Sequence, residues 1–266
     1  MMKEMAAEFR AEAQELHALC KTLTAEQWST KTLFMEWTPW DVIAHLHFFD
    51  ESSLLAATDA DAFKAHVKEL IENAMKGVSS TEQTRQKYEG IGNEAMLARW
   101  DATNAKLAAT LGGFDQKARL PWYGPDMSAR MFTTARLMET WAHGQEIHDL
   151  TGSKRVHTDR IKHIATIGVK TFGWTFINRK LEVPGAAPYV RLTAPSGEVW
   201  EFNEPSETER ITGDAVGFCQ TVTQTRNVAD VELEVVGEIA NQWMSIAQCF
   251  AGGAVDPPKP GARVGA

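Results

Sequence analysis

The sequence predicts a mainly α protein, with a helical bundle over residues 1–184, a small α+β module over 185–254 and an extended tail over 255–266. Apolar residues recur at spacings of three and four through most of the first part, which is typical of amphipathic helices. The composition then changes at Pro184-Gly-Ala-Ala-Pro188. Beyond this point apolar and polar residues alternate as they do in half-buried strands.

Local start and stop signals delimit the helices that we expect in the first part. Thr38 is a capping residue and Pro39 suits the first helical position, so a helix should run from Pro39 to about Ala57. Glycines are common just beyond helix ends, and Gly77, Gly112 and Gly152 end others. The remaining helices are expected at residues 2–23, 61–75, 79–113 with a bend at two glycines, 131–150, and from 158 onward.

The second part predicts a β-hairpin over residues 189–202, because two alternating runs flank a Pro-Ser-Gly turn. A helix is expected over 213–225, a strand over 231–236 and a second helix over 238–250. The tail is rich in Gly and Pro, so we expect it to be extended and partly mobile.

Charge and composition exclude several classes of function. The net charge of −8 and the lack of a basic run argue against a nucleic-acid-binding surface. No apolar stretch approaches the length of a membrane span, and the N-terminus has no apolar signal region. The three cysteines are too far apart to form a zinc or redox motif. We therefore expect a cytoplasmic protein with reduced thiols that acts on a small molecule, with no nucleic-acid or membrane partner.

The stretch over residues 131–150 carries the most specific chemistry. Glu139 and His143 are four residues apart, so they lie on one face of a helix. His45 lies on the helix predicted from Pro39, and facing helices of bundles commonly build metal sites. Two imidazoles and a carboxylate suit Zn²⁺ with an open fourth position, although Fe(II), Ni(II) or Mn(II) would also fit. Spacing alone leaves a solvated Glu–His pair and an ordinary histidine as the alternative.

Two motifs resemble a known family. The stretch Trp37-Thr-Pro-Trp-Asp-Val-Ile-Ala-His45-Leu is similar to the helix start and first metal histidine of the DinB/YfiT-like superfamily. Glu139-Thr-Trp-Ala-His143-Gly-Gln-Glu146 resembles the second ligand segment of its mycothiol-dependent maleylpyruvate isomerase branch, which has Glu where DinB relatives have His. Residues 211–218 and 243–252 resemble the C-terminal part of an actinobacterial-type subfamily of metal-binding proteins. The resemblance covers nearly the whole chain.

The resemblance implies a DinB-like four-helix bundle, a sterol-carrier-like C-terminal module, and His45, Glu139 and His143 as metal ligands. It also implies a divalent metal, Zn before Ni, Fe or Mn, and a low-molecular-weight thiol cosubstrate such as mycothiol. The expected activity is a thiol-dependent isomerase or S-transferase acting on a small electrophile, and a homodimer is a further expectation. Two alternatives remain open: a metal-dependent hydrolase, and a non-enzymatic binding protein that keeps a structural metal around a small or apolar ligand.

Three charged residues near the ligands have either a local role or a role at the site. Asp41 and Glu146 could each orient a ligand imidazole, but helix capping for Asp41 and a solvated acid for Glu146 are the simpler interpretations. Arg136 could anchor an acidic substrate or the carboxylate of the thiol, or pair with a surface acid. His47 and His148 are expected to be neighbours of the site, not ligands.

Overall fold

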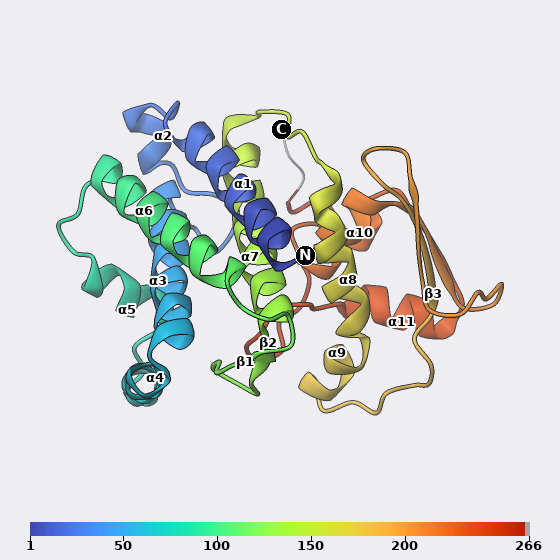
Figure 1. Cartoon of the computed structure of the whole chain (residues 1–266). Helices are drawn as coiled ribbons and strands as arrows, with labels where there is room; N and C mark the ends of the chain where they lie inside the picture. The colour runs from blue at the N-terminus through green and yellow to red at the C-terminus, as the bar shows by residue number, and fades with distance from the viewer. Residues whose placement is uncertain (264–266) are drawn as a thin grey trace. The chain divides into compact units, whose positions relative to one another are not determined.

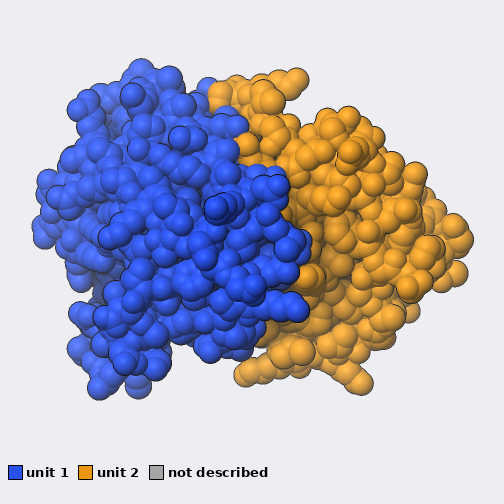
Figure 2. All heavy atoms as spheres, in the orientation of Figure 1, with its two compact units in different colours: residues 1–151 blue, residues 152–266 orange. Residues whose placement is uncertain are grey.

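The computed structural model describes residues 1–263, which divide into two compact units between Thr151 and Gly152 (Figures 1 and 2). The sequence led us to expect the division near residue 184. By contacts the division comes earlier, so helices α8 (Lys162–Lys170) and α9 (Phe172–Asn178) belong to the second unit. The packing of α8 against α10 (Ala215–Val222) explains this position. A Cβ atom added at Gly168 of α8 would lie only 2.8 Å from a methyl group of Val222, so glycine is needed for the approach.

The first unit is built on four long helices: α1 (Met2–Cys20), α3 (Pro39–Thr58), α6 (Asn93–Gly112) and α7 (Ala129–Thr151) (Figure 1). Helices α1 and α3 each contact both α6 and α7, which confirms the predicted four-helix bundle. Large apolar side chains fill the space between these helices and drive their association. Those that are almost wholly buried include Phe9, Ile43, Leu46, Met96, Trp100, Phe132 and Trp141.

Shorter elements connect the bundle helices: α2 (Ala25–Ser29), α4 (Ala60–Met75) and α5 (Ser80–Lys87). The single bent helix expected over 79–113 is wrong, because α5 and α6 are separate helices. Gly90 between them has a φ of 78°, a left-handed conformation that interrupts a helix at little cost only at glycine. A short hairpin of β1 (Arg119–Leu120) and β2 (Met127–Ser128), which the sequence did not predict, leads into α7.

The second unit holds a four-stranded sheet with strand order β4-β3-β5-β6. The expected hairpin is confirmed as β3 (Tyr189–Thr193) and β4 (Val199–Phe202), which pair antiparallel. Strand β5 (Arg210–Asp214) pairs parallel to β3, and β6 (Leu233–Val236) pairs antiparallel to β5. The sequence missed β5, where only Ile211 is buried, and the predicted helix at 213–225 begins later, as α10. Two 3₁₀ turns, η1 (Asp159–Ile161) and η2 (Val228–Asp230), and helix α11 (Glu238–Ile246) complete the unit.

The described part of the tail is held in place by hydrogen bonds, which differs from the expected mobility. The backbone N–H of Gly261 donates to both carboxylate oxygens of Asp230, at 3.0 and 2.9 Å. The Asn227 side chain donates to the Pro258 carbonyl, and Arg263 donates to the Gln224 carbonyl. Residues 264–266 of the predicted tail lie outside the described residues. Among the described helices, none is both long and apolar enough to span a membrane.

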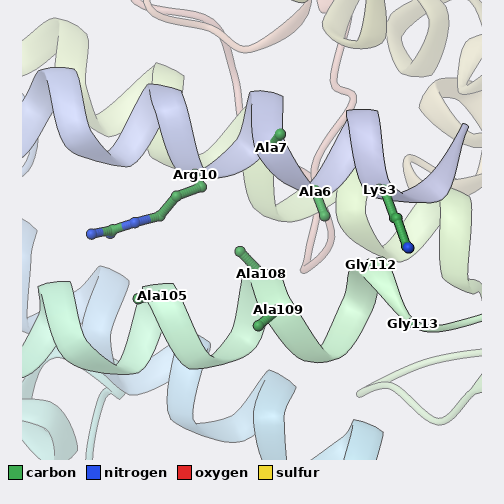
Figure 3. Close-up of a pocket in the computed structure, with 9 residues that line it drawn as sticks. All are labelled: Lys3, Ala6, Ala7, Arg10, Ala105, Ala108, Ala109, Gly112 and Gly113. Carbon is green, nitrogen blue, oxygen red and sulfur yellow. The ribbon is translucent and has the colours of Figure 1, made fainter.

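An open groove of about 470 Å³ lies between α1 and α6 (Figure 3). Its lining is mostly small: Ala6, Ala7, Ala105, Ala108, Ala109, Gly112 and Gly113, with Lys3 and Arg10. A Cβ atom on Gly112 would lie 3.4 Å from that of Ala6, so the small residues serve the close packing of two helices. The residues that line the groove include no histidine, cysteine or carboxylate, and His45, Glu139 and His143 are not among them.

Candidate metal centre

The first unit brings His45, Glu139 and His143 together at the contact between α3 and α7. His45 lies in the second turn of α3, and the other two follow one another along one face of α7. The Glu139 Oε2 atom is 3.5 Å from His45 Nε2 and 3.3 Å from His143 Nε2. One ligand atom from each of the three residues lies within 4.8 Å of the others. The same carboxylate oxygen therefore faces both imidazoles.

These separations fit a tetrahedral metal ion. Zinc bonds of about 2.0–2.1 Å to N and O ligands at tetrahedral angles place the ligand atoms roughly 3.3–3.4 Å apart. The two separations involving Glu139 are 3.5 and 3.3 Å. Furthermore, His45 Nε2 is buried without a hydrogen-bond partner, which is costly for a polar atom unless a metal binds it. The exposed fractions of the three side chains, between 12% and 24%, leave a side open for a fourth ligand.

The electrostatics of the cluster keep His45 and Glu139 in the forms that bind a metal. Burial, helped by the charge of His143, lowers the pKa of His45 to about 4, against the opposing effect of Glu139. Burial alone would raise the pKa of Glu139, but the nearby imidazoles of His143 and His45 lower it below its usual range. At neutral pH the His45 imidazole is therefore neutral and Glu139 is ionised, as metal binding requires.

Aromatic rings enclose the two imidazoles. The Trp37 ring stacks on His143 with 5.5 Å between centroids and an angle of 20°, and lies 5.0 Å from the ring of His45. Phe34 meets His143 edge-on at 5.3 Å, and Phe49 packs on His45 at 4.7 Å. Rings in these contacts restrict the rotation of the imidazoles and exclude water from their faces. Sequence reasoning missed this role, and its one signal was the position of Trp37 immediately before the α3 cap.

The loop before α3 places two of these rings. The Thr32 N–H donates to the Trp37 carbonyl at 2.7 Å, and the Trp37 N–H donates to the Phe34 carbonyl at 2.9 Å, which closes a tight turn. Within it Met35 and Glu36 have φ values of 50° and 55°. Left-handed conformations are strained for residues other than glycine, and such strain is concentrated at functional sites.

Arg136 forms an ion pair with a buried acid, whereas the two roles left open were an anchor for an acidic substrate or thiol and a pair with a surface acid. Its Nε donates to Asp50 Oδ1 at 3.0 Å, and the exposed fractions of the two side chains are 2% and 0%. The other Asp50 oxygen accepts hydrogen bonds from Trp100 Nε1 and Asn104 Nδ2, each at 3.0 Å. The guanidinium also donates to the Leu46 carbonyl at 3.4 Å. The pair therefore joins α7 to α3 about one helical turn from the ligands.

Four other residues considered from the sequence, Asp41, Glu146, His148 and His47, lie outside the cluster of His45, Glu139 and His143. Asp41 accepts from the Thr38 N–H at 2.9 Å and from Arg85 Nε at 2.7 Å, so it caps α3 and forms an ion pair. Glu146 is buried on α7, unlike a solvated acid, and His148 lies half-buried in the last turn of that helix. His47 is 3% exposed, and its Nε2 lies 3.5 Å from Glu51 Oε1.

Comparison with known proteins finds two relatives and two structures of similar fold. Two uncharacterized proteins of Mycobacterium tuberculosis, from strains CDC 1551 and H37Rv, are each 35% identical to this chain over 246 residues, covering 92% of it and 95% of their own length. The crystal structure of the mycothiol-dependent maleylpyruvate isomerase matches with a TM-score of 0.53 at 14% identity, covering 83% of this chain and 88% of that one. A mutant of the same isomerase matches equally, with a TM-score of 0.53 at 13% identity.

The structural match shows the fold, since its sequence identity is low. The family model described as the mycothiol maleylpyruvate isomerase N-terminal domain matches residues 9–148, which include α3, most of α7 and the three clustered residues. This match covers more than half of the chain. The chain therefore belongs to the mycothiol maleylpyruvate isomerase N-terminal domain family.

Proposed function

We propose that the protein is a metal-dependent enzyme that uses a low-molecular-weight thiol, such as mycothiol, to isomerise or conjugate a small electrophilic substrate. His45, Glu139 and His143 would hold the divalent metal, with Zn²⁺ the best fit. The observation that supports this most strongly is the spacing of 3.5 and 3.3 Å between Glu139 Oε2 and the two imidazole nitrogens. Family membership supports the thiol, because the solved structure of similar fold is a mycothiol-dependent isomerase.

The charge of the donor set favours an anionic fourth ligand. Two neutral imidazoles and one carboxylate contribute a single negative charge toward a divalent ion. A zinc ion held there would act as a Lewis acid and lower the pKa of a bound thiol toward neutrality. The lowered pKa of His45 keeps its nitrogen lone pair available at neutral pH. The rings of Trp37, Phe34 and Phe49 strengthen these electrostatic interactions by excluding water around the imidazoles.

The metal site is tested by metal analysis of protein purified without a histidine tag. We expect about one zinc per chain in the wild type and loss of the metal in His45→Ala. His148→Ala is the matched control, because it removes an imidazole from the same helix as His143 and should keep the metal. A wild-type level of zinc in His45→Ala with unchanged circular dichroism would contradict the ligand assignment.

The thiol is tested separately by thermal unfolding of zinc-loaded and metal-free protein with mycothiol, glutathione, bacillithiol or coenzyme A. We expect mycothiol to raise the Tm of the zinc-loaded wild type only, because a ligand that binds the folded state stabilises it. Zinc binding with no response to any of these thiols would reject thiol chemistry. Ester hydrolysis by the zinc-loaded protein without a thiol would then indicate a hydrolase.

A further inference from the structure

A second polar cluster lies along α3 from the metal ligands. It consists of Ser52 on α3, His66 on α4 and Tyr123 in the loop between β1 and β2. The His66 Nε2 atom is 2.9 Å from Ser52 Oγ and 3.3 Å from the Tyr123 hydroxyl oxygen. Ser52 follows His45 by seven residues, which is two helical turns and roughly 10 Å on the same face.

Counting hydrogens assigns the roles of these three groups. Ser52 Oγ lies 3.0 Å from the Phe48 carbonyl of its own helix and donates its only hydrogen to it. Ser52 must then accept from His66, which places the imidazole proton on Nε2. That nitrogen cannot accept the phenol hydrogen of Tyr123, so the Tyr123 oxygen can only accept from it. The phenol hydrogen is therefore not used by His66, and rotation about the C–O bond directs it either to Ser52, which is also a hydrogen-bond neighbour, or to a bound molecule.

The cluster is not suited to nucleophilic catalysis. Ser52 is only 2% exposed and its hydrogen is already donated, so the Ser52–His66 pair lacks an accessible nucleophile. Burial lowers the pKa of His66 and raises the pKa of Tyr123 to about 12, the latter against smaller effects of Ser52 and Arg136. At neutral pH the imidazole is therefore uncharged, and the phenol is a protonated hydrogen-bond donor.

A row of rings connects Tyr123 with the ligand His45. The Phe49 ring lies 4.7 Å from the His45 ring and 5.7 Å from that of Tyr123. Phe63 meets Tyr123 edge-on at 5.4 Å and Trp122 meets it at 4.8 Å, so the phenol ring is held on several sides. The donor is thus rigid, half-buried and at a set distance from the ligand cluster.

We propose that Tyr123 is a specificity residue that donates a hydrogen bond to a carboxylate or carbonyl oxygen of the small molecule bound at the metal. Ser52 and His66 are positioning residues that hold the Tyr123 oxygen, and the Tyr123 hydrogen can turn from Ser52 to the bound molecule. The rise along α3 from His45 to Ser52, roughly 10 Å, sets the length that we expect between this oxygen and the end of the molecule that meets the metal. This inference rests on the proposed metal and thiol chemistry.

The inference is tested with ω-mercaptoalkanoates that have two, five, seven or ten methylene groups between the sulfur and the carboxylate. Their binding to the zinc-loaded protein is measured. We expect the tightest binding by the wild type at seven methylenes, a span of roughly 10 Å. Tyr123→Phe should weaken the binding of the seven-methylene thiol roughly tenfold, which is the effect of losing one hydrogen bond to a charged acceptor. The substitution should leave the binding affinity of the shortest thiol unchanged. Tyr189→Phe is the matched control, because it removes an exposed phenol from the second unit.

The position of the proton provides a measurement that requires neither metal nor activity. Nitrogen NMR of the His66 ring in the metal-free protein should show the Nε2–H tautomer, and Ser52→Ala should shift this equilibrium. The opposite tautomer, or equal length dependence in the wild type and Tyr123→Phe, would overturn the inference while leaving the thiol chemistry intact. If the zinc-loaded protein binds no thiol of any length, the proposed function fails and the inference fails with it.

Discussion

The buried pair of Arg136 and Asp50 allows a sharp test of how the bundle holds its site. Replacing Arg136 by Met leaves Asp50, which is 0% exposed, with hydrogen bonds only from the neutral groups of Trp100 and Asn104. A buried charge that has lost its partner costs about 3–5 kcal/mol. We therefore expect Arg136→Met to lower the free energy of unfolding by about that amount. The loss should be much smaller in the double variant with Asp50→Leu, because no charge then remains buried.

Urea denaturation in the presence of a chelator measures these differences without a contribution from metal binding. Lys64→Met is the matched control. Its ion pair with Asp61 has nearly the same length as the buried pair, 3.1 Å against 3.0 Å, but its side chains are 70% and 93% exposed. Exposed pairs contribute less than about 1 kcal/mol. A loss in Arg136→Met as small as that of the control, or a double variant whose loss equals the sum of the two single losses, would refute the reasoning.

Three further results are expected. Trp37→Leu should weaken zinc binding by roughly tenfold or more in a chelator competition, because the ring restrains both imidazoles, and unchanged affinity would count against this role. Asp41→Ala should cost about 1–2 kcal/mol at pH 7 through loss of the α3 cap. Burial raises the pKa of Asp41, but Arg85 and Thr38 lower it more, so the folded pKa lies below the unfolded value near 3.8. The contribution of Asp41 to stability is therefore present above pH 3.8 and is lost as pH falls through the lower folded pKa. An equal difference at pH 7 and pH 2 in urea titrations would contradict this. Gly168→Ala should lower stability by about 1–3 kcal/mol through its clash with Val222, whereas Gly173→Ala, whose added methyl meets nothing within 4 Å, should not.

The parts of the fold that follow from local sequence were predictable. Helix α3 begins where Thr38, Pro39 and Asp41 indicate, because a capping box and a first-turn proline act within four residues. The β3–β4 hairpin is likewise set by two alternating runs around one turn. Strand β5 was missed because its partner β3 is remote and parallel, and its sequence has no alternation of its own.

The candidate site likewise has a part that local sequence predicted and a part that it did not. The spacing of Glu139 and His143 follows from helix geometry, so the sequence predicted that they share a face. The capped helix from Pro39 offered His45 as the third member, the resemblance to a known family implied its role as a ligand, and the structure places it beside the other two. Their binding of metal stays a prediction. The stacking of Trp37 and Phe34, and the pairing of Arg136 with Asp50, could not be predicted, because each depends on contacts between distant segments.

The sequence by itself determined the helices, their capped ends, the hairpin and the pair of ligating groups on α7, because these depend on interactions within a few residues. Tertiary structure alone decided which helix lies opposite α7, and hence that Glu139 faces His45 at 3.5 Å. It also decided that Arg136, for which an anchoring role and an acidic partner were both open, pairs with the buried Asp50 and links α7 to α3. The physical reason is that burial depends on packing between helices, and burial determines whether a charged side chain meets solvent, a substrate or another side chain.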